Sequence, residues 1–95
     1  MSNEVVNLRD KPARPYCLID RRTIYGNPFE IGKDGDRKTV VKKYAAYFED
    51  RIAKDRAFRR AVLALRDKKL ACWCAPKLCH GHVIAAWLES EVSRR

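Results

Sequence analysis

The chain has 95 residues, enough for one domain with a single modest core, and we expect that domain to span residues 1–95. The 21 Lys and Arg residues outnumber the 12 Asp and Glu residues, and the net charge of +9 predicts anionic partners, including non-specific attraction to nucleic acid. No apolar run approaches the roughly 18 residues of a membrane span and the N-terminus is polar, so we expect a cytoplasmic protein without a membrane partner. In that reducing compartment the four cysteines are expected to bind a metal, to act in catalysis or to pack in the core.

The first third of the chain predicts two short strands and a long loop. Glu4–Leu8 (EVVNL) and Tyr16–Asp20 (YCLID) have the apolar, β-branched character of strands. The connection between them is too short for a crossover helix, so the strands are either antiparallel neighbours or separated by an extended pass over one edge. Segment 21–37 is rich in Gly and Asp and predicts a packed, functional loop. Its expected apolar anchors are Ile24, Tyr25, Phe29 and Ile31.

The rest of the chain predicts two helices, a strand and a closing helix. The helices run from Arg37 to about Ala53 and from Arg56 to about Arg66, each after an Asp that can cap it. Lys69–Cys74 is typical of a strand, and Cys79 to about Val92 of a helix. Apolar residues at helical spacing are expected to face the core: Val41, Ala45, Phe48 and Ile52 with Tyr44 flanking, then Phe58, Ala61, Val62 and Leu65, then Val83, Ile84, Trp87 and Leu88. This order predicts a small α/β domain with a mixed or parallel sheet of about three strands and three helices.

The strand order predicts where a ligand would bind. Parallel strands joined by crossover helices place their carboxyl ends at one edge of the sheet, and ligands of open α/β sheets bind along that edge. If Tyr16–Asp20 and Lys69–Cys74 are parallel, Arg21 and Cys74 emerge side by side. The GNPF loop, with Gly26, Asn27 and Phe29, would then hang over them as a ligand-binding wall.

The stretch LACWCAPKLCHGH (70–82) holds three of the four cysteines and both histidines. A helix that begins near Cys79 presents free N–H groups and partial positive charge to the preceding turn, and Lys77 adds a full charge. The same field would favour a thiolate at Cys74 or Cys79, and His80 can act as a general acid or base. We therefore take Cys74, Cys79 and His80 as candidate catalytic residues. Gly81 would allow close approach to a strand or a ligand.

Zinc is the alternative use of this cluster. Its nominal ligands are Cys72, Cys74, Cys79, His80 and His82. However, two cysteines two positions apart on a strand lack the tight turn of a C-x2-C pair. No cofactor is therefore favoured, and zinc remains possible.

Three further side chains have a structural and a functional interpretation. Asn27 precedes a proline, and its amide could brace the loop or bind a ligand. Trp73 alternates away from its neighbouring cysteines and is expected to fill the core under the helices rather than to stack on a base. Cys17 lies in mid-strand and is expected to be a packing residue.

The segments RTIYGNPFEIGKDGDR, KYAAYF and LACWCAPKLCHG together resemble an uncharacterised phage and bacterial domain family with a Cys-Trp-Cys, Pro, Cys-His-Gly signature, over about residues 5–89. The chain departs from the family pattern at Asp20, where Gly is usual, and at His82, where Asp is usual. The resemblance implies a compact α/β domain but no reaction. It also implies a functional surface formed by Arg21, Gly26, Asn27, Pro28, Phe29, Cys72, Trp73, Cys74, Pro76, Cys79, His80 and Gly81.

Two functions remain open from the sequence. In the first, the domain binds a phosphorylated small molecule or nucleotide at the carboxyl edge of the sheet, either as a binding protein or as an enzyme. In the second, it is a basic accessory protein that binds nucleic acid or a partner, with a structural Cys/His cluster. The salt dependence of binding distinguishes the two: the affinity for nucleic acid would fall steeply as the salt concentration rises, whereas the affinity for a ligand in a pocket would fall less.

Overall fold

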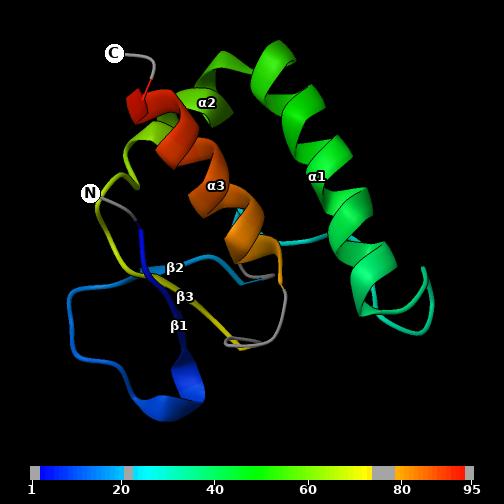
Figure 1. Ribbon diagram of the computed structural model, residues 1–95, viewed down its shortest axis with the longest axis horizontal. Coiled ribbons are helices and arrows are strands. Elements are labelled where there is room, and N and C mark those ends of the chain that lie inside the picture. The colour runs from blue at the N-terminus through cyan, green and yellow to red at the C-terminus, as the bar shows by residue number, and fades with distance from the viewer. Residues whose placement is uncertain (1–2, 21–22, 74–78, 94–95) are drawn as a thin grey trace.

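The computed structural model describes residues 3–20, 23–73 and 79–93, which form a three-stranded sheet and three helices (Figure 1). The elements are β1 (Val5–Asn7), a 3₁₀ turn (Leu8–Asp10), β2 (Cys17–Leu18), α1 (Arg37–Lys54), α2 (Arg56–Leu63), β3 (Leu70–Cys72) and α3 (His80–Ser93). The predicted small α/β domain is confirmed. None of the helices in these residues is both long enough and apolar enough to cross a bilayer.

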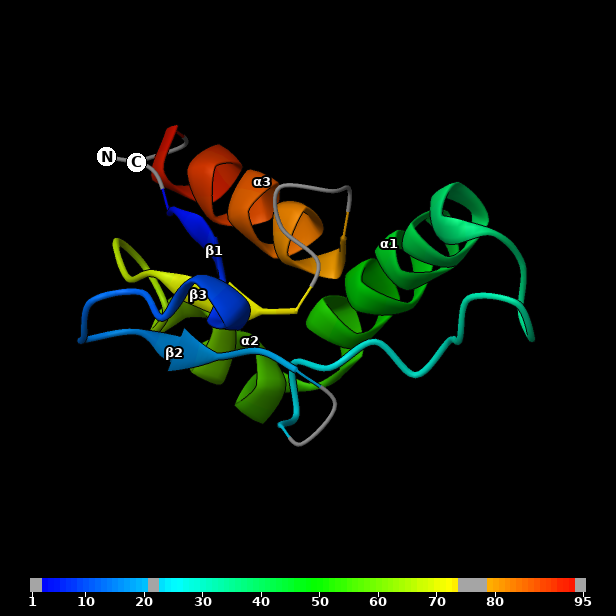
Figure 2. The ribbon, with the colours of Figure 1, turned by 90° about the horizontal axis from the view of Figure 1, so that it is seen from below.

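The sheet has the order β1-β3-β2, and both outer strands run parallel to β3. Val5 pairs with Leu70, and Leu18 pairs with Ala71. The connection between the first two strands therefore leads from one edge of the sheet to the other, because β3 lies between them (Figure 2). All of β3 is buried, as expected of a central parallel strand with helices on both faces of its sheet (Figure 2).

Asp36 and Asp55 cap the two central helices, as predicted. Asp36 Oδ1 accepts a hydrogen bond from the N–H of Thr39 (2.9 Å), and Asp55 Oδ1 accepts one from the N–H of Phe58 (3.0 Å). These backbone bonds hold the pKa of both carboxyls below the ordinary value. Because the folded pKa is lowered, the stabilisation is present at neutral pH and is lost as the pH falls through the folded pKa.

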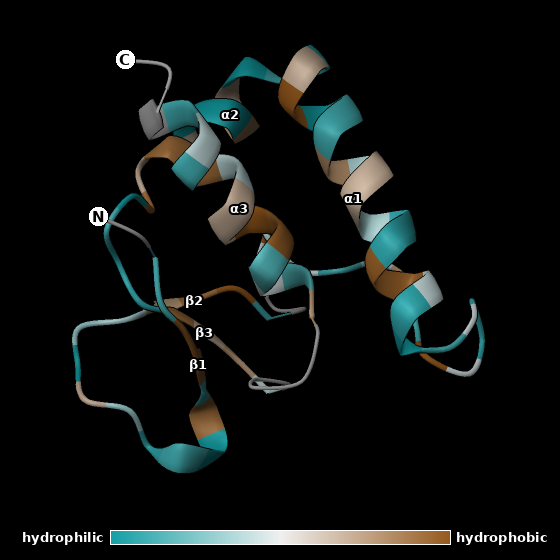
Figure 3. Ribbon diagram, in the orientation of Figure 1, coloured by the Kyte–Doolittle hydropathy of each residue, from teal (hydrophilic) through white to brown (hydrophobic). Residues whose placement is uncertain are grey.

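The core lies between the sheet and the inner faces of the helices, and the helices alternate polar and apolar residues along their length (Figure 3). Tyr44 is central in this core, not at its flank, because it is 0% exposed and contacts Phe48, Tyr47 and His80. Its hydroxyl can be buried there because it donates a hydrogen bond to the carbonyl of Tyr25 (2.8 Å). The hydroxyl group of Tyr44 can therefore lie on the buried face of α1.

The prediction that Trp73 fills the core is wrong, because half of its surface is exposed (50%). Strand β3 ends at Cys72, so the alternation that would have turned the indole inward no longer applies at residue 73. Ile24 and Ile31 are also exposed and do not anchor the long loop, whereas Tyr25 packs against the core. The loop is held by aromatic rings instead of by aliphatic side chains.

Helix α3 approaches the sheet closely at Gly81. A Cβ atom at this position would lie 2.8 Å from Ile19 Cδ1 and 3.0 Å from Val5 Cγ1, both closer than packed carbons tolerate. These neighbours belong to β1 and to the residue that follows β2. A glycine is needed here because the helix backbone lies directly on the strands.

We predict that Gly81→Ala lowers the free energy of unfolding by about 1 to 2 kcal/mol, because overpacking outweighs the roughly 1 kcal/mol gain in helix propensity. Urea unfolding followed by circular dichroism measures this change. Ile19→Val removes the Cδ1 atom that the new methyl would meet, so the double variant should lose less stability than the two single changes added together. A Gly81→Ala protein that is more stable than the wild type would contradict the close approach.

We predict that Cys17→Val costs about 1 to 2 kcal/mol of stability or less, because Cys17 is half-buried and only packs against the core cluster. Chemical denaturation measures the cost. If the variant folds normally but no longer binds a ligand of the wild-type protein, Cys17 has a role beyond packing.

Candidate functional site

The segment that follows β2 is folded by its own polar side chains. The carbonyl of Asp20 accepts hydrogen bonds from both the N–H and the hydroxyl of Thr23 (each 3.0 Å), and Gly26 N–H returns to the carbonyl of Thr23 (3.1 Å). Asn27 Oδ1 then accepts the N–H of Phe29 (2.9 Å), which is the turn expected of Asn before Pro. Segment 23–29 is thus held in one shape.

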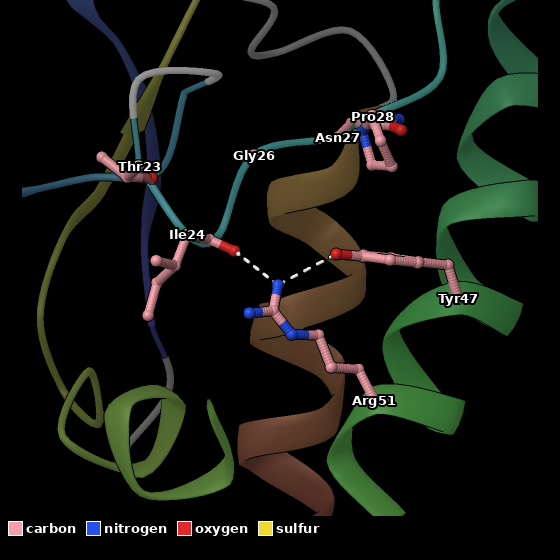
Figure 4. A pocket seen from close by; sticks show the side chains of 7 residues that line it. All are labelled: Thr23, Ile24, Gly26, Asn27, Pro28, Tyr47 and Arg51. Carbon is pink, nitrogen blue, oxygen red and sulfur yellow. Dashed lines mark hydrogen bonds between the residues drawn. The ribbon is translucent and has the colours of Figure 1, made fainter. Parts of the chain in front are cut away.

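A pocket of about 300 Å³ lies between this segment and α1, as Figure 4 shows. Tyr47 and Arg51 of α1 point toward the loop from one side, and the backbone turn closes the other. The residues that line the pocket are Thr23, Ile24, Gly26, Asn27, Pro28, Tyr47 and Arg51. This volume lies at the small end of ligand sites in proteins.

Arg51 provides the positive charge of the pocket. Its Nη1 donates to the carbonyl of Ile24 (3.3 Å) and to the hydroxyl of Tyr47 (2.9 Å). The guanidinium also lies over the ring of Phe58, 4.1 Å from its centre, and Nε lies 3.6 Å from Asp55 Oδ2. These contacts orient a side chain that is 31% exposed, while Nη2 has no hydrogen-bond partner in residues 3–20, 23–73 and 79–93.

Two further donors line the same pocket. Asn27 is 9% exposed, and its NH₂ group has no hydrogen-bond partner within the part of the chain that the structure describes. Tyr47 accepts a bond from Arg51, so its own hydroxyl hydrogen can be donated. The pocket therefore offers N–H and O–H groups and one positive charge, which match a ligand made of acceptor oxygens.

Tyr44 connects this pocket to the start of α3. Its hydroxyl holds the carbonyl of Tyr25 in the loop, and its ring makes an edge contact with His80 at 5.2 Å between centroids. Burial raises the pKa of Tyr44 far above its ordinary value, so the hydroxyl remains a donor throughout the physiological range. Burial likewise raises the pKa of Tyr25, whose hydroxyl donates to the carbonyl of Ala61 (3.2 Å).

The Cys/His cluster is buried at the junction of β3 and α3. The sulfur atoms of Cys72 and Cys79 lie 3.5 Å apart. His80 Nε2 contacts the carbonyl of Ile19, and because a carbonyl can only accept, Nε2 carries the hydrogen. His82 Nδ1 accepts the N–H of Cys79 (3.1 Å), so it takes up one of the donors at the start of the helix. The described cysteine and histidine side chains of the cluster therefore contact each other, the backbone at the start of α3 and the sheet.

The zinc alternative finds no support in the described residues. Among them, no three Cys, His, Asp or Glu side chains converge as a metal site would require. Cys72, Cys79, His80 and His82 are described, whereas Cys74 lies outside the described residues.

The structure separates the predicted site residues into two groups. Gly26 and Asn27 line the pocket, and Phe29 packs edge-on against Tyr47 beside it. Cys79, His80 and Gly81 lie instead against the strands. Arg21, Cys74 and Lys77 fall outside the described residues, so their predicted meeting is not tested.

Sequence reasoning did not single out Tyr47 or Arg51 as site residues. The signal was present in the helical spacing. Arg51 is seven positions after Tyr44 and three after Phe48, which places it on the flank of the buried stripe. A cation at such a position lies at the edge of the core and can contact the segments that pack beside the helix, here Ile24 of the loop and Phe58 of α2.

Comparisons with known proteins agree with the resemblance seen in the sequence. The chain is 37% identical over 68 residues to the "Uncharacterized 12.4 kDa protein in nrdA-td intergenic region" of Enterobacteria phage T4, which covers 70% of this chain. The match spans 61% of the length of that phage protein. No solved structure matches the chain. The model of the family described as "Domain of unknown function (DUF4326)" matches residues 6–90, so the chain belongs to that family.

Proposed function

We propose that the protein binds a phosphorylated small molecule, with the phosphate held at Arg51 in the pocket between segment 23–28 and α1. The observation that carries this proposal is Asn27, which lines the pocket and whose NH₂ group is open to solvent there and has no hydrogen-bond partner in the described residues. No buried side-chain donor in the described residues lacks a partner, so this NH₂ group faces solvent, where an acceptor oxygen of a ligand can reach it.

The charge and chemistry of the wall support an anion. Arg51 contributes Nη2, Asn27 its NH₂ group and Tyr47 its hydroxyl hydrogen, so the described wall presents three kinds of donor. The oxygens of a phosphate are strong acceptors for the N–H groups of a guanidinium. Asp55 neutralises part of the Arg51 charge from the Nε side, which leaves Nη2 as the group that meets the ligand.

The proposal covers binding and includes no reaction. The described thiols Cys72 and Cys79 are buried at the sheet and do not line the pocket. His80 is likewise held to the carbonyl of Ile19. The catalytic roles predicted for Cys79 and His80 therefore have no support from the pocket geometry.

We predict that inorganic pyrophosphate binds the wild-type protein and that Arg51→Gln weakens this binding about 10- to 100-fold, as expected for loss of a charge-assisted hydrogen bond. Isothermal titration calorimetry at 150 mM salt measures the affinity. Arg56→Gln is the matched control, because it removes the same charge from an exposed position on the neighbouring helix.

Tyr47→Phe gives a second test if Arg51→Gln destabilises the loop. The aromatic ring stays packed against Phe29 and Tyr44, and only the hydroxyl is lost, so pyrophosphate affinity should fall about 3- to 10-fold with folding intact. Equal losses in Arg51→Gln and Arg56→Gln, together with binding that disappears between about 50 and 200 mM salt, would contradict the pocket. That result would favour a diffuse basic surface that binds nucleic acid.

That second function rests on the net charge of +9. On α2 the exposed cations Arg56 and Arg60 could contact a phosphate backbone. Arg59 is different, because it pairs with Glu91 (2.7 Å) and lies over the ring of Trp87. It therefore helps to hold α2 against α3 as well as carrying surface charge.

A further inference from the structure

Trp73 is the large apolar side chain that the fold leaves in water directly after its central strand. The three residues of β3 are all buried, yet the next side chain has half of its surface exposed. Leaving a large indole in contact with water forgoes the stabilisation that burial would provide. The exposed half is therefore a candidate contact surface.

Trp73 is nevertheless tied to its neighbours by two long hydrogen bonds, one from its backbone and one from its indole. The carbonyl of Trp73 accepts from Asn7 Nδ2 (3.4 Å), and its Nε1–H donates to Asp20 Oδ2 (3.4 Å). Asp20 is itself only 7% exposed, so the ring is anchored to a buried carboxylate. A side chain that is ordered before binding loses little conformational entropy when a ligand stacks on it.

Asp20 joins Trp73 to the wall of the pocket. Leu18 pairs with Ala71 in the parallel register, so Asp20 and Trp73, each two residues further on, leave the sheet side by side. The side chain of Asp20 holds the indole, while its carbonyl holds Thr23, which lines the pocket. The indole and the Arg51 pocket thus share one edge of the sheet and one turn of chain.

We propose that the phosphorylated ligand is a nucleotide whose base stacks on the exposed part of Trp73 while its phosphate binds at Arg51. This inference rests on the proposed function and adds the chemical class of the ligand. A nucleotide combines, in one molecule, the acceptor oxygens that fit the donors of the pocket and a planar ring that stacks on an indole. The positive net charge of the chain favours the approach of such an anion.

Fluorescence tests the stacking directly once Trp73 is the sole indole. Trp87, the other tryptophan, packs edge-on against Phe48, so Trp87→Phe keeps an aromatic ring at that position. In this background, ADP should quench the emission of Trp73, whereas ribose 5-phosphate and pyrophosphate should not. ADP should also bind more tightly than pyrophosphate.

Substitutions at Trp73 then separate the contribution of the base to the affinity from that of the phosphate. Trp73→Ala should weaken ADP about 5- to 150-fold, the range measured for loss of one base-aromatic stack, and change pyrophosphate affinity less than about twofold. Trp73→Phe should retain part of the ADP affinity. Ile31→Ala is the matched control, because Ile31 is as exposed (53%) as Trp73 but is not among the described residues that line the pocket. Its ADP affinity should be unchanged.

The outcomes distinguish this inference from the proposed function. If pyrophosphate binding depends on Arg51, but ADP binds no more tightly than pyrophosphate and its affinity is unchanged by Trp73→Ala, the ligand is not a nucleotide. The proposed anion pocket would still be supported by that result. Absence of any Arg51-dependent binding overturns both. Circular dichroism of each variant confirms that the loss of affinity is not a loss of folding.

Discussion

One turn of helix ties the whole sheet together. Cys79, His80 and Gly81 are consecutive, and each contacts a different part of the sheet. Cys79 lies against Cys72 of β3, His80 binds the carbonyl that follows β2, and Gly81 lets Val5 of β1 approach the helix. Because β1 and β2 do not pair with each other, this turn and the central strand together fix their positions.

The candidate pocket is built outward from the same turn. The His80 ring packs against Tyr44, and the Tyr44 hydroxyl holds the loop carbonyl of Tyr25. The segment after Tyr25 is thereby placed opposite Tyr47 and Arg51. A signature histidine can therefore be required for the shape of a binding site without touching the ligand.

Much of the fold could be predicted from the sequence, because helical periodicity and Asp caps are local signals. Residues that depend on tertiary contacts were harder to place. Tyr44 was expected at the flank of the buried stripe, and the hydrogen-bond partner that allows its hydroxyl to be buried at the centre lies 19 residues away. Arg51 was not singled out, because Phe58, the ring beneath it, belongs to the next helix. Trp73 was assigned by alternation to a strand that ends one residue earlier.

The position of β3 has a consequence for how the chain acquires its fold. Both outer strands belong to the first 18 residues, but they pair with residues 70–72 and not with each other. During synthesis they have no partner until three quarters of the chain has been made. Every strand pair then closes a loop of more than 50 residues, which is costly in entropy and slow. The sheet is therefore expected to assemble late, on a scaffold of helices α1 and α2 that can form from local contacts as soon as they are made.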